Sequence, residues 1–284
     1  MDIGIGLPNT VPGVEGRVML GWARRAEERG FSTLATLDRV AYPSYDSLPT
    51  LAAAAAATDR IGLMTNILLA PTRNAILLAK AAASVDQLSG GRLTLGLGVG
   101  GRQDDFVASE RRFEDRGRRF DEDLELMHGA WRGESVGGCP RPPTPRPTNG
   151  RAVPVMIGGL SDRAVERVAR WGIGWTAGGG SPDQVGPFAE RVRAEWREAG
   201  RDGEPKIAAL AYFSMGRGTE ERSIENLLDY YGPDARPFAE AVPRGRDEVR
   251  RTVERFRTAG VGEVILFPTV PELSEVDLLA DAVL

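Results

Sequence analysis

The chain has 284 residues, of which 42% are hydrophobic, so it can bury a full-sized core in one or two domains. Its formal net charge is −4, and no basic run is interleaved with aromatic residues, which argues against a nucleic-acid partner. The single cysteine, Cys139, excludes an intramolecular disulfide framework, and one cysteine with one histidine excludes the usual zinc sites.

The first residues, MDIGIGLPN, lack the basic start and the long apolar core of a signal peptide. No run of about 18 apolar residues offers a membrane span. We therefore expect a soluble, cytoplasmic protein with no membrane partner.

Short apolar runs alternate with stretches of helical periodicity along the whole chain. Gly30 closes the first helical stretch, and Phe120, Leu124, Met127 and Trp131 recur on one face of a later one. Strands are expected at 2–7, 32–37, 61–70, 92–99, 153–159, 173–177, 206–215 and 262–268. Helices are expected at 14–30, 47–59, 74–91, 116–133, 161–172, 182–200, within 219–259 and at 271–284.

Nearly continuous apolar strands are typical of a parallel sheet that is covered on both faces. Eight strand–helix units in a chain of this length favour a single (β/α)8 TIM barrel spanning residues 1–284. The alternative is a doubly wound open sheet, which would more naturally carry a glycine-rich phosphate turn after the first strand, where this chain has GLPNTVPG. The sequence therefore predicts the α/β barrel, with a proline-rich loop at 133–152.

Active-site residues of such barrels lie at the carboxyl ends of the strands, and acid–base groups are scarce there. Asp38 and Arg39 follow the second strand, while His128 lies in a helix, where we expect a solvated or half-buried residue. Asp38, Asp104 and Asp105 are too sparse to predict a metal site. Because the protein alone offers little chemistry, we expect a cofactor to supply it.

Two successive glycine-rich turns are the best candidates for a phosphate site. Gly158 and Gly159 end the fifth strand, with Ser161 at the N-cap of the next helix, and one strand later residues 178–180 are all glycine. Such turns offer backbone N–H groups and the positive end of a helix dipole to an anion. The residues alone leave two interpretations equally open, an anion cradle or ordinary strand-to-helix loops.

Several longer motifs resemble one family. SGGRLTLGLGVGGRQDDF at 89–106, RGRRFDEDLELMHGAWRGE at 116–134 and NILLAPTRNAILLAKAAASVDQL at 66–88 are similar to the luciferase-like monooxygenase superfamily. Its members are flavin- and F420-dependent oxidoreductases built on a (β/α)8 barrel, and the resemblance spans nearly the whole chain. It implies a bacterial luciferase-like barrel.

The resemblance also implies a site. It places a non-prolyl cis peptide bond between Asn66 and Ile67, in a bulge behind the central flavin ring. It places the strand-four glycines so close to the cofactor that larger side chains would occupy its space. Asp38 is implied near the reactive face of the ring, with Arg39 beside it as the second catalytic candidate. The implied cofactor-binding residues are Asn66, Ile67, Gly98, Val99, Gly100, Gly158, Gly159, Ser161, Gly178 and Gly179.

Two positions depart from some F420-dependent members, which carry histidine and glutamate where this chain has Arg39 and Gly101. A sugar-phosphate dehydrogenase mechanism that uses those two groups is therefore disfavoured. Tyr42, Tyr45 and Arg102 are expected at the mouth of the barrel as substrate contacts, although each suits a surface or packing role as well. The 133–152 loop is expected to be a surface connection, with a lid over the site as the alternative.

The resemblance favours a monooxygenase that uses reduced FMN and O2 on a small organic substrate, with FMN supplied by a separate flavin reductase. The alternative is hydride transfer with coenzyme F420, and a second alternative is a non-catalytic flavin-binding barrel. The family often forms dimers, so a homodimer is a further expectation. Substrate identity depends on loop side chains that the sequence does not place.

Overall fold

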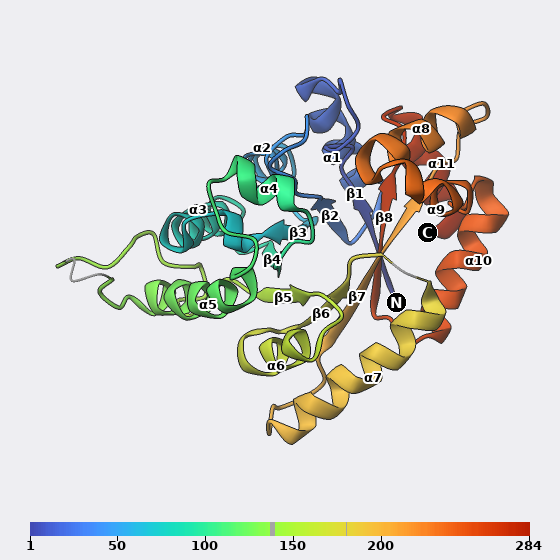
Figure 1. The fold of residues 1–284 in the computed structure, drawn as a ribbon. Coiled ribbons are helices and arrows are strands. Elements are labelled where there is room, and N and C mark those ends of the chain that lie inside the picture. Colours follow the sequence, from blue (N-terminus) through green and yellow to red (C-terminus); the bar gives the residue numbers. More distant parts are fainter. Residues whose placement is uncertain (137–139, 180) are drawn as a thin grey trace.

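Eight parallel strands pair in chain order and close into a barrel in the computed structural model, which describes residues 1–136, 140–179 and 181–284 (Figure 1). β1 pairs with β8, with Asp2 opposite Glu263, and this pairing closes the sheet. The predicted (β/α)8 barrel is confirmed. Cys139 and Gly180 lie outside the described residues.

The strands are β1 (Asp2–Gly6), β2 (Thr33–Thr36), β3 (Gly62–Leu69), β4 (Leu93–Gly98), β5 (Val155–Gly158), β6 (Gly174–Ala177), β7 (Lys206–Phe213) and β8 (Glu263–Pro268). The helices that follow them are α1 (Gly16–Arg29), α2 (Ser47–Ala57), α3 (Ala75–Leu88), α4 (Gln103–Ala108), α5 (Arg116–Arg132), α6 (Asp162–Trp171), α7 (Pro182–Glu198), α8 (Glu220–Tyr231), α9 (Arg236–Glu240), α10 (Gly245–Thr258) and α11 (Ser274–Val283).

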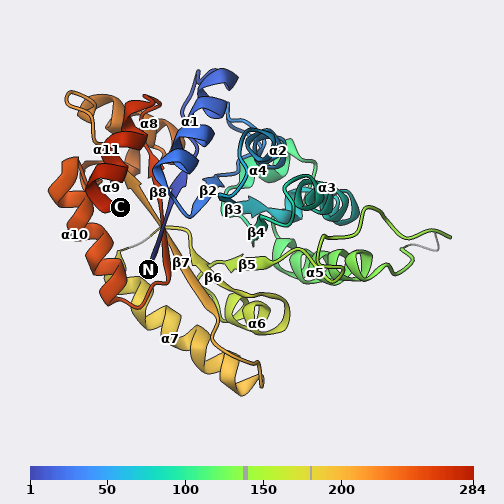
Figure 2. The same cartoon turned by 180° about the vertical axis from the view of Figure 1, so that it is seen from behind.

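The helices surround the strands on the outside, as the views from opposite sides show (Figures 1 and 2). Two layers of apolar side chains therefore form. One buried cluster joins strand residues such as Met64, Met156, Leu210 and Ile265, and a larger one joins the strands to the surrounding helices. The predicted helical face of α5 is buried there, since Phe120, Leu124, Met127 and Trp131 are all nearly inaccessible, with Trp131 the most exposed at 2%.

Helix ends follow the local signals in the sequence. Gly30 ends α1 with φ of 88°, a left-handed conformation that glycine adopts without a steric penalty. Ser161 caps α6, since its hydroxyl accepts a hydrogen bond from the Ala164 backbone N–H at 3.2 Å. His128 lies half-buried on α5, as expected, against the rings of Trp131 and Trp171.

The predicted helical region 219–259 is divided into α8, a 3₁₀ turn at Pro233–Ala235, α9 and α10. Gly232 follows α8 with φ of 94°, and Pro233 begins the next turn, so the chain changes direction there. As a consequence, α8 stops at two tyrosines, Tyr230 and Tyr231, beside the mouth of the barrel.

The proline-rich loop joins the end of α5 to the start of β5, so it lies at the amino-terminal face of the barrel. Its Thr148 backbone N–H donates to Asp86 on α3 at 2.7 Å, and the Arg146 backbone carbonyl accepts from Gln87 at 2.9 Å. The described part of this loop projects from the barrel beyond α5 (Figures 1 and 2). The described part of the loop therefore lies at the face opposite the carboxyl ends of the strands, which favours the expected surface connection over a lid.

Within the described residues, no helix is long and apolar enough to cross a membrane.

Candidate functional site

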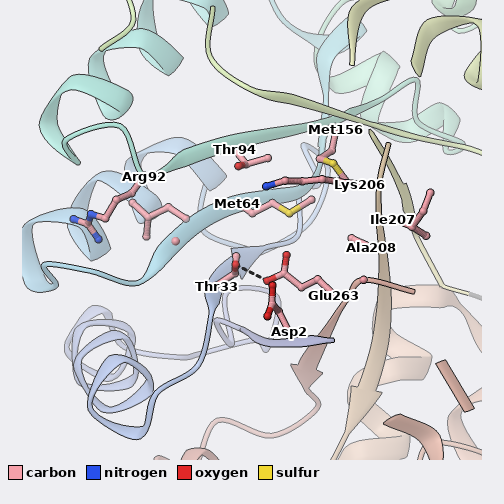
Figure 3. Close-up of a pocket in the computed structure, with 13 residues that line it drawn as sticks. Asp2, Thr33, Met64, Arg92, Thr94, Met156, Lys206, Ile207, Ala208 and Glu263 are labelled. Carbon is pink, nitrogen blue, oxygen red and sulfur yellow. Dashed lines mark hydrogen bonds between the residues drawn. The ribbon is translucent and has the colours of Figure 1, made fainter. Parts of the chain in front are cut away.

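Two cavities lie at opposite ends of the barrel. The larger, about 310 Å³, opens where the strands begin and is lined by Asp2, Thr33, Lys206 and Glu263, the first residues of β1, β2, β7 and β8 (Figure 3). Glu263 there accepts hydrogen bonds from the hydroxyls of Ser32 at 2.7 Å and Thr33 at 2.6 Å. In (β/α)8 enzymes the chemistry lies at the other end, so size alone does not make this cavity the active site.

The second cavity, about 180 Å³, opens at the carboxyl ends of the strands. It brings together residues of β3 and β7, residues that follow β2, β4 and β6, and the end of α8. Its lining consists of Leu37, Asp38, Arg39, Asn66, Ile67, Leu69, Gly100, Gly101, Arg102, Asp105, Gly178, Leu210, Tyr230 and Tyr231. We refer to it as the mouth pocket.

Asn66 and Ile67 form part of this pocket at a break in β3. The peptide bond between them is cis, as the resemblance implied, and the pairing of β3 with β4 shifts between Thr65 and Leu68. Asn66 is fully buried, and its amide oxygen accepts a hydrogen bond from the Thr176 hydroxyl at 2.8 Å. Its amide nitrogen, Nδ2, has no partner within the described part of the chain. A buried donor left unpaired is costly, so this N–H₂ group is suited to a ligand oxygen or nitrogen.

The glycines beside this break make room for Ile67. A Cβ at Gly98 would lie 2.0 Å from Cδ1 of Ile67, and a Cβ at Gly158 would lie 3.0 Å from its Cγ2. Packing against Ile67 therefore explains why glycine stands at both positions, and the sequence alone does not show this contact. Gly100 differs, because its φ of 78° is left-handed, and a Cβ there would meet Phe106 at 3.2 Å.

Asp38 is buried and fully engaged by the protein. One carboxylate oxygen accepts from the Leu69 backbone N–H at 2.9 Å, and the other accepts from Arg73 at 2.8 Å. Burial raises the pKa of Asp38, while Arg73 and the Leu69 N–H oppose that rise. These bonds tie the end of β2 to the end of β3, and a catalytic role for Asp38 stays a prediction.

Arg39 is held by two carboxylates from α4. Its Nε donates to Asp105 at 2.7 Å, and a terminal nitrogen donates to Asp104 at 2.7 Å. The second oxygen of Asp105 accepts from the backbone N–H groups of Val40 at 2.7 Å and Ala41 at 2.8 Å. Asp105 thus fixes the loop after β2, and no local pattern in the sequence indicates this contact. Whether Arg39 is catalytic also stays a prediction.

Aromatic side chains from α8 line one side of the pocket, and sequence analysis missed them. Tyr230 is 8% exposed, and its ring packs edge-on against those of Tyr42 at 5.1 Å and Tyr231 at 4.7 Å between centroids. The hydroxyls of Tyr231 and Tyr212 are 2.8 Å apart and share a hydrogen bond. Burial raises the pKa of Tyr230 and of Tyr231, so both phenols are neutral near pH 7.

The three predicted substrate contacts separate in the structure. Arg102 lines the pocket, whereas Tyr42 and Tyr45 lie in the loop after β2 outside its lining. Tyr42 donates its hydroxyl hydrogen to Asp229 on α8 at 2.6 Å, and Tyr45 donates to the Val14 carbonyl at 2.8 Å. These bonds give both tyrosines a packing role, and their contact with substrate stays a prediction.

The two glycine-rich turns lie after β5 and β6. Gly159 has φ of 114°, and its carbonyl accepts from the indole of Trp175 at 2.8 Å, which fixes the first turn. Gly159 and Ser161 are exposed, and no atom would lie within 4 Å of a Cβ at Gly178 or Gly179. Of these residues, Gly178 lines the mouth pocket. Val99 precedes Gly100 and is half-buried, outside the lining.

The closed barrel and a mouth pocket at its carboxyl-terminal end define an enzyme-type (β/α)8 architecture. The chain belongs to the luciferase-like monooxygenase family, whose model matches residues 1–263. The predicted family is confirmed.

A relative from Mycobacterium tuberculosis, an uncharacterized protein, is 29% identical over 255 residues, which cover 76% of this chain and 88% of the relative. The crystal structure of a monooxygenase from Streptomyces bottropensis aligns with a TM-score of 0.82 and 24% identity, covering 99% of this chain and 98% of that one. A coenzyme F420-dependent tetrahydromethanopterin reductase from Methanopyrus kandleri aligns with a TM-score of 0.79 and 18% identity, covering 100% and 99%. At these identities the two structural likenesses concern the fold.

Proposed function

We propose that the protein is a flavin-dependent oxidoreductase that binds its cofactor in the mouth pocket, most simply a monooxygenase that uses reduced FMN and O2. The observation that carries this proposal is the buried amide of Asn66. Its oxygen is occupied by Thr176, its buried N–H₂ group has no protein partner among the described residues, and Asn66 is one of the residues that line the pocket. Flavin rings carry carbonyl oxygens and ring nitrogens that accept such a hydrogen bond.

The residues at the pocket fit a flat ring with a phosphate tail. Ile67, Leu69 and Leu210 offer apolar walls, while Asn66 offers a buried donor that no described residue satisfies. The turns after β5 and β6, in which Gly159, Ser161 and Gly178 are exposed, lead into α6 and α7, so their backbone N–H groups suit a phosphate. When bound, reduced FMN would supply the reaction with O2 that no side chain of this chain supplies.

The protein's own contribution is binding, orientation and exclusion of water. Asp38 and Asp105 hold the loops after β2 and β3 in place, which fixes one rim of the pocket. The rings of Tyr230 and Tyr231 shield another side from solvent. A dry pocket protects a reactive cofactor state from hydrolysis. In this proposal, a separate flavin reductase supplies the reduced cofactor.

Hydride transfer with coenzyme F420 is the second candidate, because a structural neighbour of this chain is an F420-dependent reductase. The unpaired N–H₂ group of Asn66 suits either cofactor, since both ring systems carry carbonyl oxygens that accept a hydrogen bond. The two candidates differ in chemistry, because a reduced deazaflavin donates a hydride and reacts poorly with O2.

A parallel binding titration tests the proposal. The purified protein is titrated with FMN and with coenzyme F420, each oxidised and reduced, and followed by fluorescence and absorbance. Tight binding of reduced FMN supports the oxygenase, and preference for F420 supports hydride transfer instead. If neither cofactor binds, the proposed cofactor site is refuted, and the pocket must bind another kind of ligand.

Asn66→Leu removes the proposed donor while keeping the side-chain volume. We expect it to weaken cofactor binding about tenfold, the effect of losing one buried hydrogen bond. Asn149→Leu, at an exposed position of the proline-rich loop, is the matched control and should bind the cofactor as the wild type does. Gly178→Asp, at a position where no atom lies within 4 Å of a Cβ, would place a carboxylate at the second proposed phosphate turn. Unchanged affinity in that variant would show that the turn is assigned wrongly.

A further inference from the structure

The charged side chains at the mouth pocket are almost all paired within the protein. Asp38 accepts from Arg73, and Arg39 donates to both Asp104 and Asp105. Arg102 is the exception, because no carboxylate lies within 4.0 Å of its guanidinium in the part of the chain that the structure describes. It also makes no side-chain hydrogen bond with those residues. Its five N–H donors are left for a ligand or for water.

Arg102 is nevertheless held in one place by the tyrosines of α8. Its guanidinium carbon lies 5.3 Å from the ring centroid of Tyr230 and 5.5 Å from that of Tyr231, distances at which a cation is attracted to a ring face. Arg102 also lowers the pKa of Tyr231, opposing the larger effect of burial. These contacts hold the group without using its hydrogen-bond donors, so the guanidinium is preorganised to bind an anion.

Apolar side chains share the pocket with this cation. Leu37, Ile67 and Leu210 line the same pocket, and the tyrosine phenols beside Arg102 are neutral near pH 7. The carboxylates that share the pocket, on Asp38 and Asp105, accept hydrogen bonds from other donors. A ligand that suits this pocket carries a carboxylate, which pairs with the planar guanidinium, and an apolar group, which packs against the apolar side chains.

We propose that Arg102 binds the carboxylate of the substrate, so that the enzyme acts on small apolar carboxylic acids. This inference rests on the proposed function, since it assigns the substrate of the same pocket. The cofactor's phosphate is the other anion available, but the glycine turns after β5 and β6 supply its proposed cradle.

Matched acid and amide pairs test the assignment without knowledge of the true substrate. Phenylacetate, butyrate and octanoate are each compared with their neutral amides by ligand-observed NMR, up to about 50 mM and at low salt. We expect at least one acid to bind about tenfold more tightly than its amide. Arg102→Gln should remove that preference while leaving amide binding unchanged, and Arg102→Lys should keep part of it because the charge stays and the planar fork is lost.

Arg112→Gln is the matched control, since its side chain is 78% exposed and the same charge is removed. It should retain the full acid preference. Equal binding of acid and amide in every pair, or an unchanged preference in Arg102→Gln, would overturn the proposal. Inorganic phosphate and reduced FMN form a second arm. If Arg102→Gln weakens the binding of phosphate and FMN but leaves the binding of the carboxylates unchanged, the guanidinium binds the cofactor and the proposal is wrong. A wild type that binds acids but no flavin would refute the proposed function alone.

Discussion

Gly98→Ala tests whether the glycine at the end of β4 exists to make room for Ile67. A Cβ at position 98 would lie 2.0 Å from Cδ1 of Ile67 and 3.4 Å from its Cγ1. Overpacking of a core costs about 1–3 kcal/mol, and because Cδ1 is a terminal methyl that can rotate away, we expect about 1–2 kcal/mol. Ile67→Val deletes the clashing methyl and by itself costs about 1 kcal/mol. The double variant should therefore be about as stable as Ile67→Val alone.

Guanidinium denaturation of the four proteins gives the free energies of unfolding and the coupling energy between the two sites. We expect that coupling to recover about 1–2 kcal/mol, nearly the whole cost of Gly98→Ala. Gly101→Ala is the matched control, because no atom lies within 4 Å of a Cβ there and its backbone is not left-handed. It should change stability by less than about 0.5 kcal/mol. Additive effects of Gly98→Ala and Ile67→Val would refute the packing explanation.

Two further predictions concern buried charged or ionisable groups. Asp105→Asn should cost about 3 kcal/mol of stability because it breaks a buried ion pair with Arg39. Asp104 is a half-exposed partner of the same arginine, so Asp104→Asn should cost less than about 1 kcal/mol. Thermal unfolding of both variants measures the two costs. Burial lowers the pKa of His128 to about 4, so the unfolded chain takes the proton first and stability is lost as pH falls from about 6.5 towards 4. Relative to His128→Phe, the wild type should lose about 1–2 kcal/mol between pH 7 and pH 5, and an equal pH dependence of both proteins would contradict the assignment.

Local signals in the sequence predicted the elements well, because each depends on neighbours a few residues away. Apolar runs placed all eight strands, and the serine before an amphipathic run placed the cap of α6 at Ser161. The cis bond at Asn66 came from the family resemblance and not from residue periodicity. The eight strand–helix units favoured a closed barrel over an open sheet, and the pairing of β1 with β8 confirms that the barrel closes.

The missed features depend on contacts between distant parts of the chain. Tyr230 and Tyr231 fall inside the predicted helical region 219–259, and nothing local shows that a helix ends there or that its end meets the loop after β4. Asp105 binds Arg39 across 66 positions, a separation at which sequence pattern carries no distance information. The sequence also does not show that a Cβ at Gly98 would meet Ile67, and the role of Gly98 in cofactor binding stays a prediction.

The contrast between Arg39 and Arg102 shows why residue type alone does not identify a binding group. Both are arginines at strand ends, and both guanidinium carbons lie within 5.7 Å of the Tyr230 ring centroid. Two aspartates occupy the donors of Arg39, so that side chain stabilises the rim of the pocket. Arg102 has no such partner among the described residues, and neither has the amide nitrogen of Asn66. Folding pairs the side chains of Asp38, Arg39 and Asp105 at this mouth, whereas Arg102 and the Asn66 amide nitrogen are left without a partner in the described part of the chain and so are available to hold a ligand.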